Sequence, residues 1–278
     1  LGPTIGWRNC FYALGALGLA LAVVLLFVKE TPRKHAAKPN ADGKIERPGL
    51  GEIFRTTFRA LRHSPALALT MTGGIAMHFI LGAATYDQLW FVQERGFDRA
   101  WIAQMTGWIA AGAGILGNLF GGIGGDRWLK RTGQGRAMFL FWVMLVLAPF
   151  HIAYRLVPPD SAFFWVGVFV GFFQLGAFYG PTFSSVQELV PPQIRATVVA
   201  FYILVLNLLG LGIGITAGGI AIDMMRDAGV AQPYTWTLVV FTIISMIAIP
   251  CFWFAGHRYQ RDQERLFALE ERLAEGTA

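Results

Sequence analysis

Charged residues are scarce in this chain. Of its 278 residues, only 14% are Asp, Glu, Lys or Arg, whereas 55% are hydrophobic. A soluble domain usually carries about 25% charged residues, because its surface faces water. The composition therefore excludes a soluble enzyme and a soluble nucleic-acid-binding protein, and it indicates a protein that lies in the lipid bilayer.

The chain also has only two cysteines and none of the common catalytic motifs. Cys10 and Cys251 each lie in an apolar stretch without CxxC or Cys/His spacing, which supports neither a disulfide framework nor a zinc site. We interpret both as small apolar residues, and we expect no metal and no cofactor. The chain contains no HExxH, no GxSxG and no paired carboxylates inside an apolar run, so the sequence does not favour an intramembrane enzyme.

Long uncharged runs make up most of what is present. A transmembrane helix needs about 20 mostly apolar residues. Seven runs of suitable length lack Asp, Glu, Lys and Arg: 9–28, 64–86, 100–125, 137–154, 161–187, 196–222 and 228–256. Because they show no alternation of lipid-facing and lumen-facing residues, the sequence predicts an all-α polytopic bundle of seven transmembrane helices.

The net charge of +6 is unevenly distributed. Eighteen of the 23 Lys and Arg residues follow the first, third and fifth runs or lie in the C-terminal tail. Cytoplasmic loops are enriched in Lys and Arg, so this side is predicted to be cytoplasmic, with the N-terminus of this chain outside and Ala278 inside. The excess thus indicates orientation, and no nucleic-acid partner is expected. An outside N-terminus that begins at Leu1 without a signal leads us to expect a missing upstream half.

The predicted domains are a first helix in 1–29, a cytoplasmic loop in 30–63, a six-helix domain in 64–256 and a cytoplasmic tail in 257–278. Within the loop, residues 50–63 read as a short helix at the cytoplasmic interface, and a plain solvated helix is the alternative. One face would carry apolar side chains and another basic ones: Phe54, Phe58 and Leu61 against Arg55, Arg59 and Arg62.

An internal repeat relates the third and sixth runs. Five positions recur at a constant offset of 97 residues, Gly117, Gly121, Gly122, Ile123 and Asp126 matching Gly214, Gly218, Gly219, Ile220 and Asp223. The two runs cross the membrane in opposite directions, so the repeat is inverted, with three-helix units at 64–154 and 161–256. Inverted three-helix repeats are typical of secondary transporters, although two glycine-rich helices can share glycines by coincidence. The same glycines form small-xxx-small ladders that let helix backbones approach closely.

Three stretches resemble the major facilitator superfamily. The opening Gly6-Trp7-Arg8-Asn9-Cys10-Phe11 and Glu30-Thr31-Pro32-Arg33 are similar to the family's sixth helix and its cytoplasmic exit, and Gly122-Ile-Gly-Gly-Asp126-Arg127-Trp-Leu-Lys130-Arg131 resembles its loop motif, except that Leu129 replaces a usual glycine. The stretch 190–197, VPPQIRAT, followed by Asn207-Leu-Leu-Gly210, is similar to spinster-like and related bacterial members.

This resemblance implies the C-terminal half of a twelve-helix transporter, with the last helix of the N-terminal half in front of it. The expected function is transport of a small organic solute across the bacterial inner membrane by alternating access. We expect the protein to be a proton-coupled secondary transporter, a symporter, and not an enzyme. The expected partners are a small-molecule substrate, the lipid bilayer and the N-terminal half. An exporter of amphiphilic lipids or lysolipids with the same fold is the alternative, and a seven-helix receptor or sensor is a more distant one.

The loop motif also has a physical interpretation of its own. Asp126 lies at a helix end beside glycines such as Gly122, within reach of Arg127, Lys130 and Arg131. A charge cluster there is able to latch the cytoplasmic helix ends in one state and release them in the other. Simple positive-inside anchoring is the alternative, and it does not explain the carboxylate.

Polar residues inside the runs are few, and such groups are functional candidates in a membrane. The candidates for substrate or proton contact are His78, Tyr86, Asp87, Gln174, Tyr179 and Asn207. His78 suits proton coupling because histidine titrates near neutrality, and a histidine bonded to a neighbouring helix is the alternative. Gln174 and Asn207 need partners and are expected to meet substrate or each other. No Arg or Lys lies in the middle of a run, so an anionic substrate is expected to find its counter-charge in the missing half or at helix N-termini.

Overall fold

The computed structural model describes residues 6–29 and 50–275, which belong to two compact units, Leu1–Arg47 and Pro48–Ala278. The first unit contains one helix, α2 (Trp7–Leu26). All regular structure in the described residues is helical. Seven helices or helix pairs are long and apolar enough to cross a membrane, which confirms the predicted all-α membrane protein.

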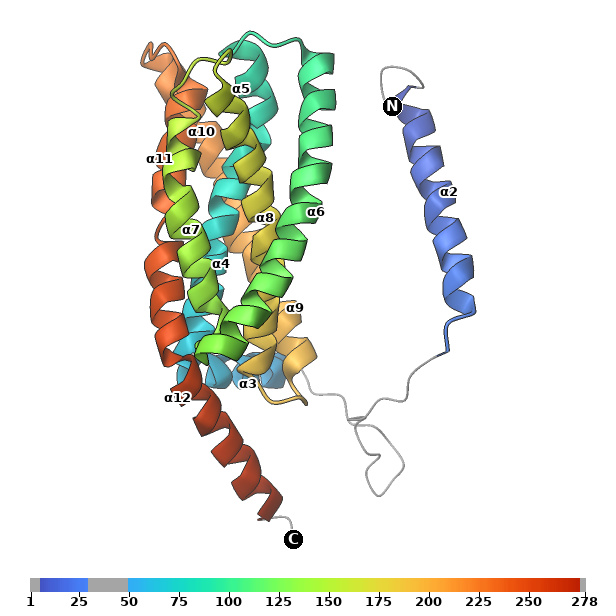
Figure 1. The fold of residues 1–278 in the computed structure, drawn as a ribbon, viewed down its shortest axis with the longest axis vertical. Helices are drawn as coiled ribbons and strands as arrows, with labels where there is room; N and C mark the ends of the chain where they lie inside the picture. Colours follow the sequence, from blue (N-terminus) through green and yellow to red (C-terminus); the bar gives the residue numbers. More distant parts are fainter. Residues whose placement is uncertain (1–5, 30–49, 276–278) are drawn as a thin grey trace. The chain divides into compact units, whose positions relative to one another are not determined.

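The described part of the second unit contains six candidate spans. They form an upright bundle with the short helix α3 across one end (Figure 1). Several spans are built from two or three consecutive helical segments. In chain order the elements are α3 (Leu50–His63), α4 (Pro65–Ala83), η1 (Ala84–Tyr86), α5 (Asp87–Gln93), α6 (Arg99–Thr132), α7 (Arg136–Ala153), α8 (Ala162–Glu188), α9 (Arg195–Val205), η2 (Leu206–Gly212), α10 (Ile213–Asp227), α11 (Pro233–Ser245) and α12 (Ala248–Glu275).

Local sequence determines where several of these helices begin and end. The side chain of Ser64 accepts a hydrogen bond from the Leu67 amide at the start of α4, and Asp98 accepts one from Trp101 at the start of α6. Both are side-chain N-caps of the ordinary kind. α6 ends at Gly133, whose φ of 69° is the left-handed conformation that glycine adopts without strain.

The predicted glycine ladder lets α6 and α8 touch backbone to backbone. A Cβ atom added to Gly117 would lie 2.1 Å from the carbonyl oxygen of Phe173, and one added to Gly121 would lie 2.3 Å from that of Ala177. No side chain larger than hydrogen fits at these distances, so the predicted close approach of helix backbones is confirmed for this pair.

The second ladder does the same between α4 and the span that contains α10. A Cβ on Gly214 would lie 2.1 Å from the carbonyl oxygen of Phe79, and one on Gly82 would lie 2.4 Å from that of Leu211. Both contacts therefore join the first span of the bundle to the fifth at a distance that only glycine permits.

The first and last spans of the bundle cap each other at both ends. The carboxylate of Glu94, just after α5, accepts hydrogen bonds from the amides of Tyr234 and Thr235 at the start of α11, at 2.7 and 2.9 Å. At the other end, the Asp262 carboxylate on α12 accepts from the amide of Ala66 in the first turn of α4, at 2.7 Å. Buried helix N-termini leave amides without partners, and each span supplies the other's missing acceptor.

The fifth span of the bundle differs from the uninterrupted helix expected over 196–222. It changes to a π-helix over Leu206–Gly212 before continuing as α10. Gly210 lies in this segment, and a Cβ there would come within 2.5 Å of the Cβ of His78. The wider π turn carries this tight crossing, and π segments occur frequently at functional sites.

The boundary predicted at residue 257 is not a break. α12 passes through it and continues to Glu275, so the expected tail helix is an extension of the last span. α3 is present over 50–63, with exposed Phe54 and Phe58 on a strongly amphipathic helix. The part of the predicted cytoplasmic loop over residues 30–49 lies outside the described residues.

Replacing a ladder glycine will separate the helices. Gly117→Ala is expected to lower the free energy of unfolding by about 1–3 kcal/mol, because the new methyl group would overlap the α8 backbone. The measurement is thermal unfolding of the purified full-length protein in detergent. Gly112→Ala in the same helix is the control, since nothing lies within 4 Å of a Cβ there. Equal stabilities of the two variants would show that the contact is not tight.

Candidate functional site

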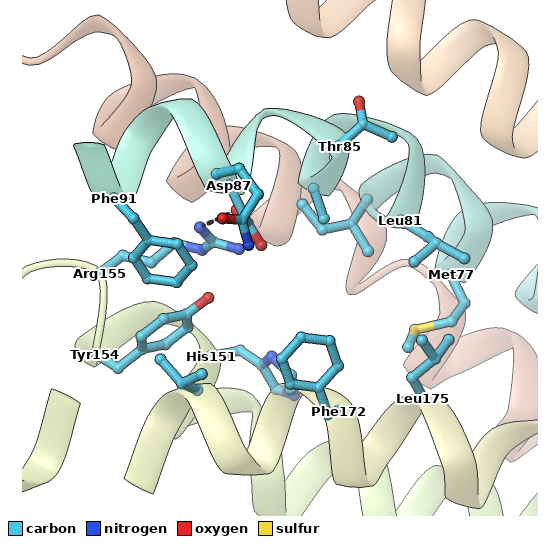
Figure 2. Close-up of a pocket in the computed structure, with 15 residues that line it drawn as sticks. Met77, Leu81, Thr85, Asp87, Phe91, His151, Tyr154, Arg155, Phe172 and Leu175 are labelled. Carbon is cyan, nitrogen blue, oxygen red and sulfur yellow. Dashed lines mark hydrogen bonds and ion pairs between the residues drawn. The ribbon is translucent and has the colours of Figure 1, made fainter. Parts of the chain in front are cut away.

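A cavity of about 380 Å³ lies between α4, α5, the end of α7 and α8. Figure 2 shows its walls, with Asp87, Arg155 and Tyr154 toward one end and Met77 and Leu175 toward the other. Most of the lining is apolar: Met77, Ile80, Leu81, Ala84, Phe91, Val168, Gly171, Phe172 and Leu175. The polar lining residues are Thr85, Asp87, Gln88, His151, Tyr154 and Arg155. This volume lies within the range of small-molecule pockets in proteins.

An ion pair lies at the polar end of the cavity. Arg155 Nη1 donates to Asp87 Oδ1 at 3.0 Å, and the Arg155 side chain is only 5% exposed while that of Asp87 is 25% exposed. The two residues are 68 positions apart, on α5 and on the connection after α7. A buried pair of this kind needs both members, because removal of one leaves an unpaired charge in a low-dielectric site.

Aromatic rings hold the guanidinium of Arg155 in place. Its Cζ lies 5.2 Å from the ring centre of Trp90 and 4.9 Å from that of Tyr154, which are cation–π distances. Burial by itself disfavours the charged form, but the neighbouring Asp87 carboxylate outweighs this and raises the pKa of Arg155 above its ordinary value. Arg155 is therefore a permanent cation in the cavity wall.

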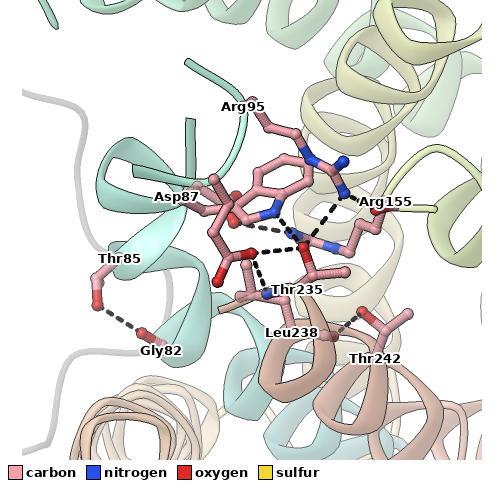
Figure 3. A network of polar contacts seen from close by, with 10 residues as sticks. Gly82, Thr85, Asp87, Arg95, Arg155, Thr235, Leu238 and Thr242 are labelled. Carbon is pink, nitrogen blue, oxygen red and sulfur yellow. Dashed lines mark hydrogen bonds and ion pairs between the residues drawn. The ribbon is translucent and has the colours of Figure 1, made fainter. Parts of the chain in front are cut away.

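A second layer of polar contacts supports this pair (Figure 3). Arg95 donates to the backbone carbonyl of Arg155 and, at 3.2 Å, to the hydroxyl of Thr235. That hydroxyl donates to Glu94 at 2.6 Å and accepts from the Trp90 indole at 2.8 Å. The capping carboxylate of α11, the second arginine and the tryptophan thus form one network that fixes the backbone at Arg155.

His78 lies in the middle of α4, where it contacts α8. Its Nδ1 donates to the carbonyl of Gly74 at 3.1 Å, and its Nε2 lies 3.3 Å from the hydroxyl of Tyr179. The side chain is buried and also packs beside Phe178. Two of the predicted candidates, His78 and Tyr179, are thus brought together across two helices.

A second histidine pairs with another candidate. His151 Nε2 donates to Gln174 Oε1 at 2.8 Å, and the Gln174 amide nitrogen lies 3.6 Å from the sulfur of Met77. These groups border a smaller void of about 40 Å³ behind the main cavity. His151 also lines the main cavity, so it joins the two spaces.

The remaining candidates lie elsewhere. Tyr86 donates to the carbonyl of Ile215 on α10 at 3.1 Å. Asn207 is exposed and donates to the carbonyl of Ile203 in its own span. The expectation that Gln174 and Asn207 meet each other is therefore wrong: the glutamine is satisfied by His151 instead, and the π segment turns the asparagine to the surface.

The loop-motif carboxylate has a different partner from those expected. Asp126 pairs with Arg136 at 2.9 Å, whereas the sequence suggested Arg127, Lys130 or Arg131, none of which forms an ion pair in the described part of the chain. Arg136 is placed at the start of α7, where it reaches back across the loop.

Arg136 extends this contact into a cluster of four helices. It also pairs with Glu188 at the end of α8, whose other carboxylate oxygen accepts from the hydroxyl of Tyr259 on α12 at 2.9 Å. The last part of α6, the start of α7, the end of α8 and the middle of α12 are thus tied together by one guanidinium, two carboxylates and a tyrosine hydroxyl. We name Asp126, Arg136, Glu188 and Tyr259 the loop cluster.

Sequence reasoning did not identify Arg155 and Arg136 as site residues. Both were counted only as loop charges that set the orientation, because each lies just outside an uncharged run. The expectation that this chain offers no counter-charge to an anionic group is wrong for the main cavity, which Arg155 lines. The adjacent Tyr154-Arg155 pair, an aromatic beside a cation at a helix end, was the available signal.

Comparison with known proteins places this geometry in a family context. A sequence model described as Major Facilitator Superfamily matches residues 1–215. A curated relative, an "MFS-type efflux pump" of Mycolicibacterium smegmatis, is 23% identical over 265 residues, which are 94% of this chain and 59% of the relative.

Two solved structures of a bacterial homologue of the human lysosomal transporter Spinster share the fold. The inward-facing unoccupied form has a TM-score of 0.65 and the inward-facing occupied form 0.62, both at 19% identity and over 92% of this chain. The matches cover 60% and 59% of those chains. This chain thus spans about three fifths of the length of the relatives that it matches.

The contact between His151 and Gln174 is expected to contribute to stability. Gln174→Leu will lower the free energy of unfolding by about 1–3 kcal/mol, because it leaves a buried imidazole N–H without an acceptor. The double variant His151→Phe with Gln174→Leu removes both polar groups and is expected to regain most of that loss. Thermal unfolding of the single and double variants measures the coupling. Purely additive losses would contradict the contact.

Proposed function

Because this chain belongs to the major facilitator superfamily, we propose that it supplies the six C-terminal helices of a secondary transporter, preceded by the last helix of the N-terminal half. The transporter moves a small organic solute across the bacterial inner membrane by alternating access. The superfamily resemblance found in the sequence is confirmed, and the receptor alternative has no support in these matches. The uneven distribution of Lys and Arg supports the loop cluster as the cytoplasmic end.

The main cavity is the single observation that carries this proposal. It has the size of a small solute, it is mostly apolar, and its polar lining includes the Asp87–Arg155 ion pair. Ionisable groups inside a membrane span are costly and mark substrate or ion pathways, and Asp87 lies within the span Pro65–Gln93. In the proposed orientation the cavity belongs to the outer half of the bundle, at the opposite end from the loop cluster.

An inverted repeat would allow the two three-helix units of the bundle to move against each other during transport. Two glycine contacts are equivalent in the two halves: Gly82 approaches the carbonyl of Leu211, at 2.4 Å, as Gly176 approaches that of Gly114, at 2.6 Å. Gly114 and Leu211 are related by the offset of 97 residues, and Gly82 and Gly176 by one of 94. These equivalent crossings support two three-helix units, 64–154 and 161–256, related by a pseudo-two-fold axis. Transporters of this construction expose a fixed site to either side in turn.

An amphiphilic substrate is the alternative that the structure favours most. The apolar majority of the cavity lining suits an acyl chain as well as a small solute, with the ion pair contacting a headgroup. Transport assays with the reconstituted full-length protein distinguish the two classes. A lysolipid that is transported when its water-soluble headgroup is not would assign an amphiphilic substrate, and the reverse would assign a small solute.

The loop cluster is proposed to hold the cytoplasmic side closed. Arg136→Gln is expected to favour the inward-open state, so that a cysteine at cavity residue Thr85 becomes less reachable from outside. In a cysteine-free full-length background, the rate at which a membrane-impermeant maleimide labels Thr85→Cys should fall at least about fivefold, an ordinary coupling free energy. Labelling of right-side-out vesicles measures this rate.

Arg258→Gln is the matched control for this experiment. Arg258 is an exposed arginine on α12 that forms no ion pair in the described residues, so its loss should leave the labelling rate unchanged. A rate that is unaffected or increased in Arg136→Gln would exclude the loop cluster as a closing device for the cytoplasmic side.

Proton coupling is proposed to pass through His78. Its contact with Tyr179 in the middle of the bundle gives a titratable group a partner on the facing helix. In proteoliposomes, an imposed proton gradient should accelerate uptake of the solute that best stabilises the full-length protein in a thermal-shift screen. His78→Gln, which keeps hydrogen bonding but does not titrate, should abolish that acceleration. If the proton gradient still accelerates uptake by the variant, His78 is not the residue that couples transport to protons.

A further inference from the structure

We propose that the main cavity binds a zwitterionic group, one anionic and one cationic centre on the same small molecule, by exchange against the Asp87–Arg155 pair. The anion takes the place of Asp87 beside Arg155, and the cation takes the place of Arg155 beside Asp87. This inference rests on the proposed transport function and specifies the charge of its substrate.

Both members of the pair are available from the cavity. Asp87 and Arg155 both line it, and Figure 2 shows the two side chains meeting at its wall. The guanidinium uses Nη1 on Asp87, while its Nε is sealed from solvent and has no hydrogen-bond partner among the described residues. The residue is 4% exposed. Arg155 is thus a buried cation that lines the cavity and whose ion-pair partner among the described residues is Asp87.

No neighbouring charge is free to replace a lost partner. Glu94 is committed to the amides of α11 and to the hydroxyl of Thr235. Arg95 is committed to that hydroxyl and to the carbonyl of Arg155. His151, the remaining titratable group on the facing helix, donates to Gln174. The Asp87–Arg155 pair must therefore be compensated by whatever ligand separates it.

This constraint selects the charge of the ligand. A pure anion would take Arg155 and leave Asp87 unpaired in a mostly apolar wall, and a pure cation would leave Arg155 unpaired between Trp90 and Tyr154. Either outcome carries the cost of an uncompensated buried charge. A zwitterion replaces both partners at once, so its binding leaves no charge without a counter-charge.

The rest of the cavity suits the cationic end. Phe91, Phe172 and Tyr154 supply aromatic faces within the same lining, and ammonium groups, above all methylated ones, bind to such faces. The anionic end is a carboxylate or a phosphate, both of which suit a guanidinium. This zwitterionic chemistry occurs in free solutes and in lipid headgroups, and the experiment below distinguishes these sources.

The test uses three probes of nearly equal shape and different charge. Glycine betaine is the zwitterion, tert-butylacetate is its anionic isostere, and choline is its cationic analogue. Thermal-shift and calorimetric titrations of the purified full-length protein should show betaine binding at least about tenfold more tightly than either single-charge probe. Phosphocholine and lysophosphatidylcholine form the second arm. Tighter binding of phosphocholine assigns a free solute, and tighter binding of lysophosphatidylcholine assigns a lipid headgroup.

Substitutions of the pair make the test specific. Asp87→Asn should weaken betaine binding and strengthen tert-butylacetate binding relative to wild type, because Arg155 no longer has a competing carboxylate. Arg155→Gln should have the opposite effect and favour choline. Asp160→Asn, at an exposed carboxylate in the connection between α7 and α8, is the control and should change neither preference. The double variant Asp87→Asn with Arg155→Gln stays neutral and should fold even where a single variant does not, and it should lose the betaine preference.

Equal affinity of the wild type for betaine and tert-butylacetate would overturn the proposal. So would a betaine preference that survives in the double variant, or absence of binding by betaine, phosphocholine and lysophosphatidylcholine alike. The labelling of Thr85→Cys requires no ligand. If that labelling still responds to Arg136→Gln while the charge preference is missing, only the zwitterion inference fails and the transport proposal stands.

Discussion

The buried ion pair between Asp87 and Arg155 is the interaction on which the cavity end of the bundle depends. It joins two segments that are distant in sequence, and it places two charges in a wall that is otherwise mostly apolar. Such a pair adds little net stability in many proteins, but loss of one partner costs about 3–5 kcal/mol. The surrounding residues are arranged accordingly: aromatic rings enclose the cation, and Arg95 holds the backbone that carries it.

Contacts elsewhere in the bundle hold the helices around this pair in position. Glu94 and Asp262 cap the N-termini of α11 and α4, so the first and last spans are fastened at both ends. Gly117 and Gly214 bring the neighbouring spans into backbone contact. Where the backbones touch, a helix moves with its neighbour. We therefore expect the helices that these glycines join to move as rigid pairs.

The large-scale architecture could be predicted because it follows from composition and periodicity. Uncharged runs of membrane-spanning length predicted the number of candidate spans found in the described residues, and glycines spaced four apart identified the close contacts of α6 and α10. The pairing of His78 with Tyr179 was not predicted, although both had been singled out. Hydrogen bonds between helices depend on their rotation about their own axes, which polarity along the sequence does not specify.

The charged parts of the site were harder to predict for a physical reason. Arg155 and Arg136 lie at helix ends, where a long side chain is able either to extend into water or to fold back over the protein. A count of charges along the sequence does not distinguish these two side-chain directions. They are distinguished only by the contacts of the folded chain, which are the cation–π contact of Arg155 with Trp90 and the ion pair of Arg136 with Glu188. The π segment over Leu206–Gly212 was missed similarly, because its cause is a crossing with another helix and not a local signal.

Alternating access is the central claim, and distances between spin labels test it most directly. In the full-length protein, one pair of labels joins Arg99, at the cavity end of α6, to the outer surface of the other six-helix half, and a second pair joins Thr132 to its cytoplasmic surface. The account predicts two populated distances for each pair, with the shorter outer distance accompanying the longer cytoplasmic one under every condition. A single unchanging distance at both ends, across proton gradients and added solutes, would contradict it.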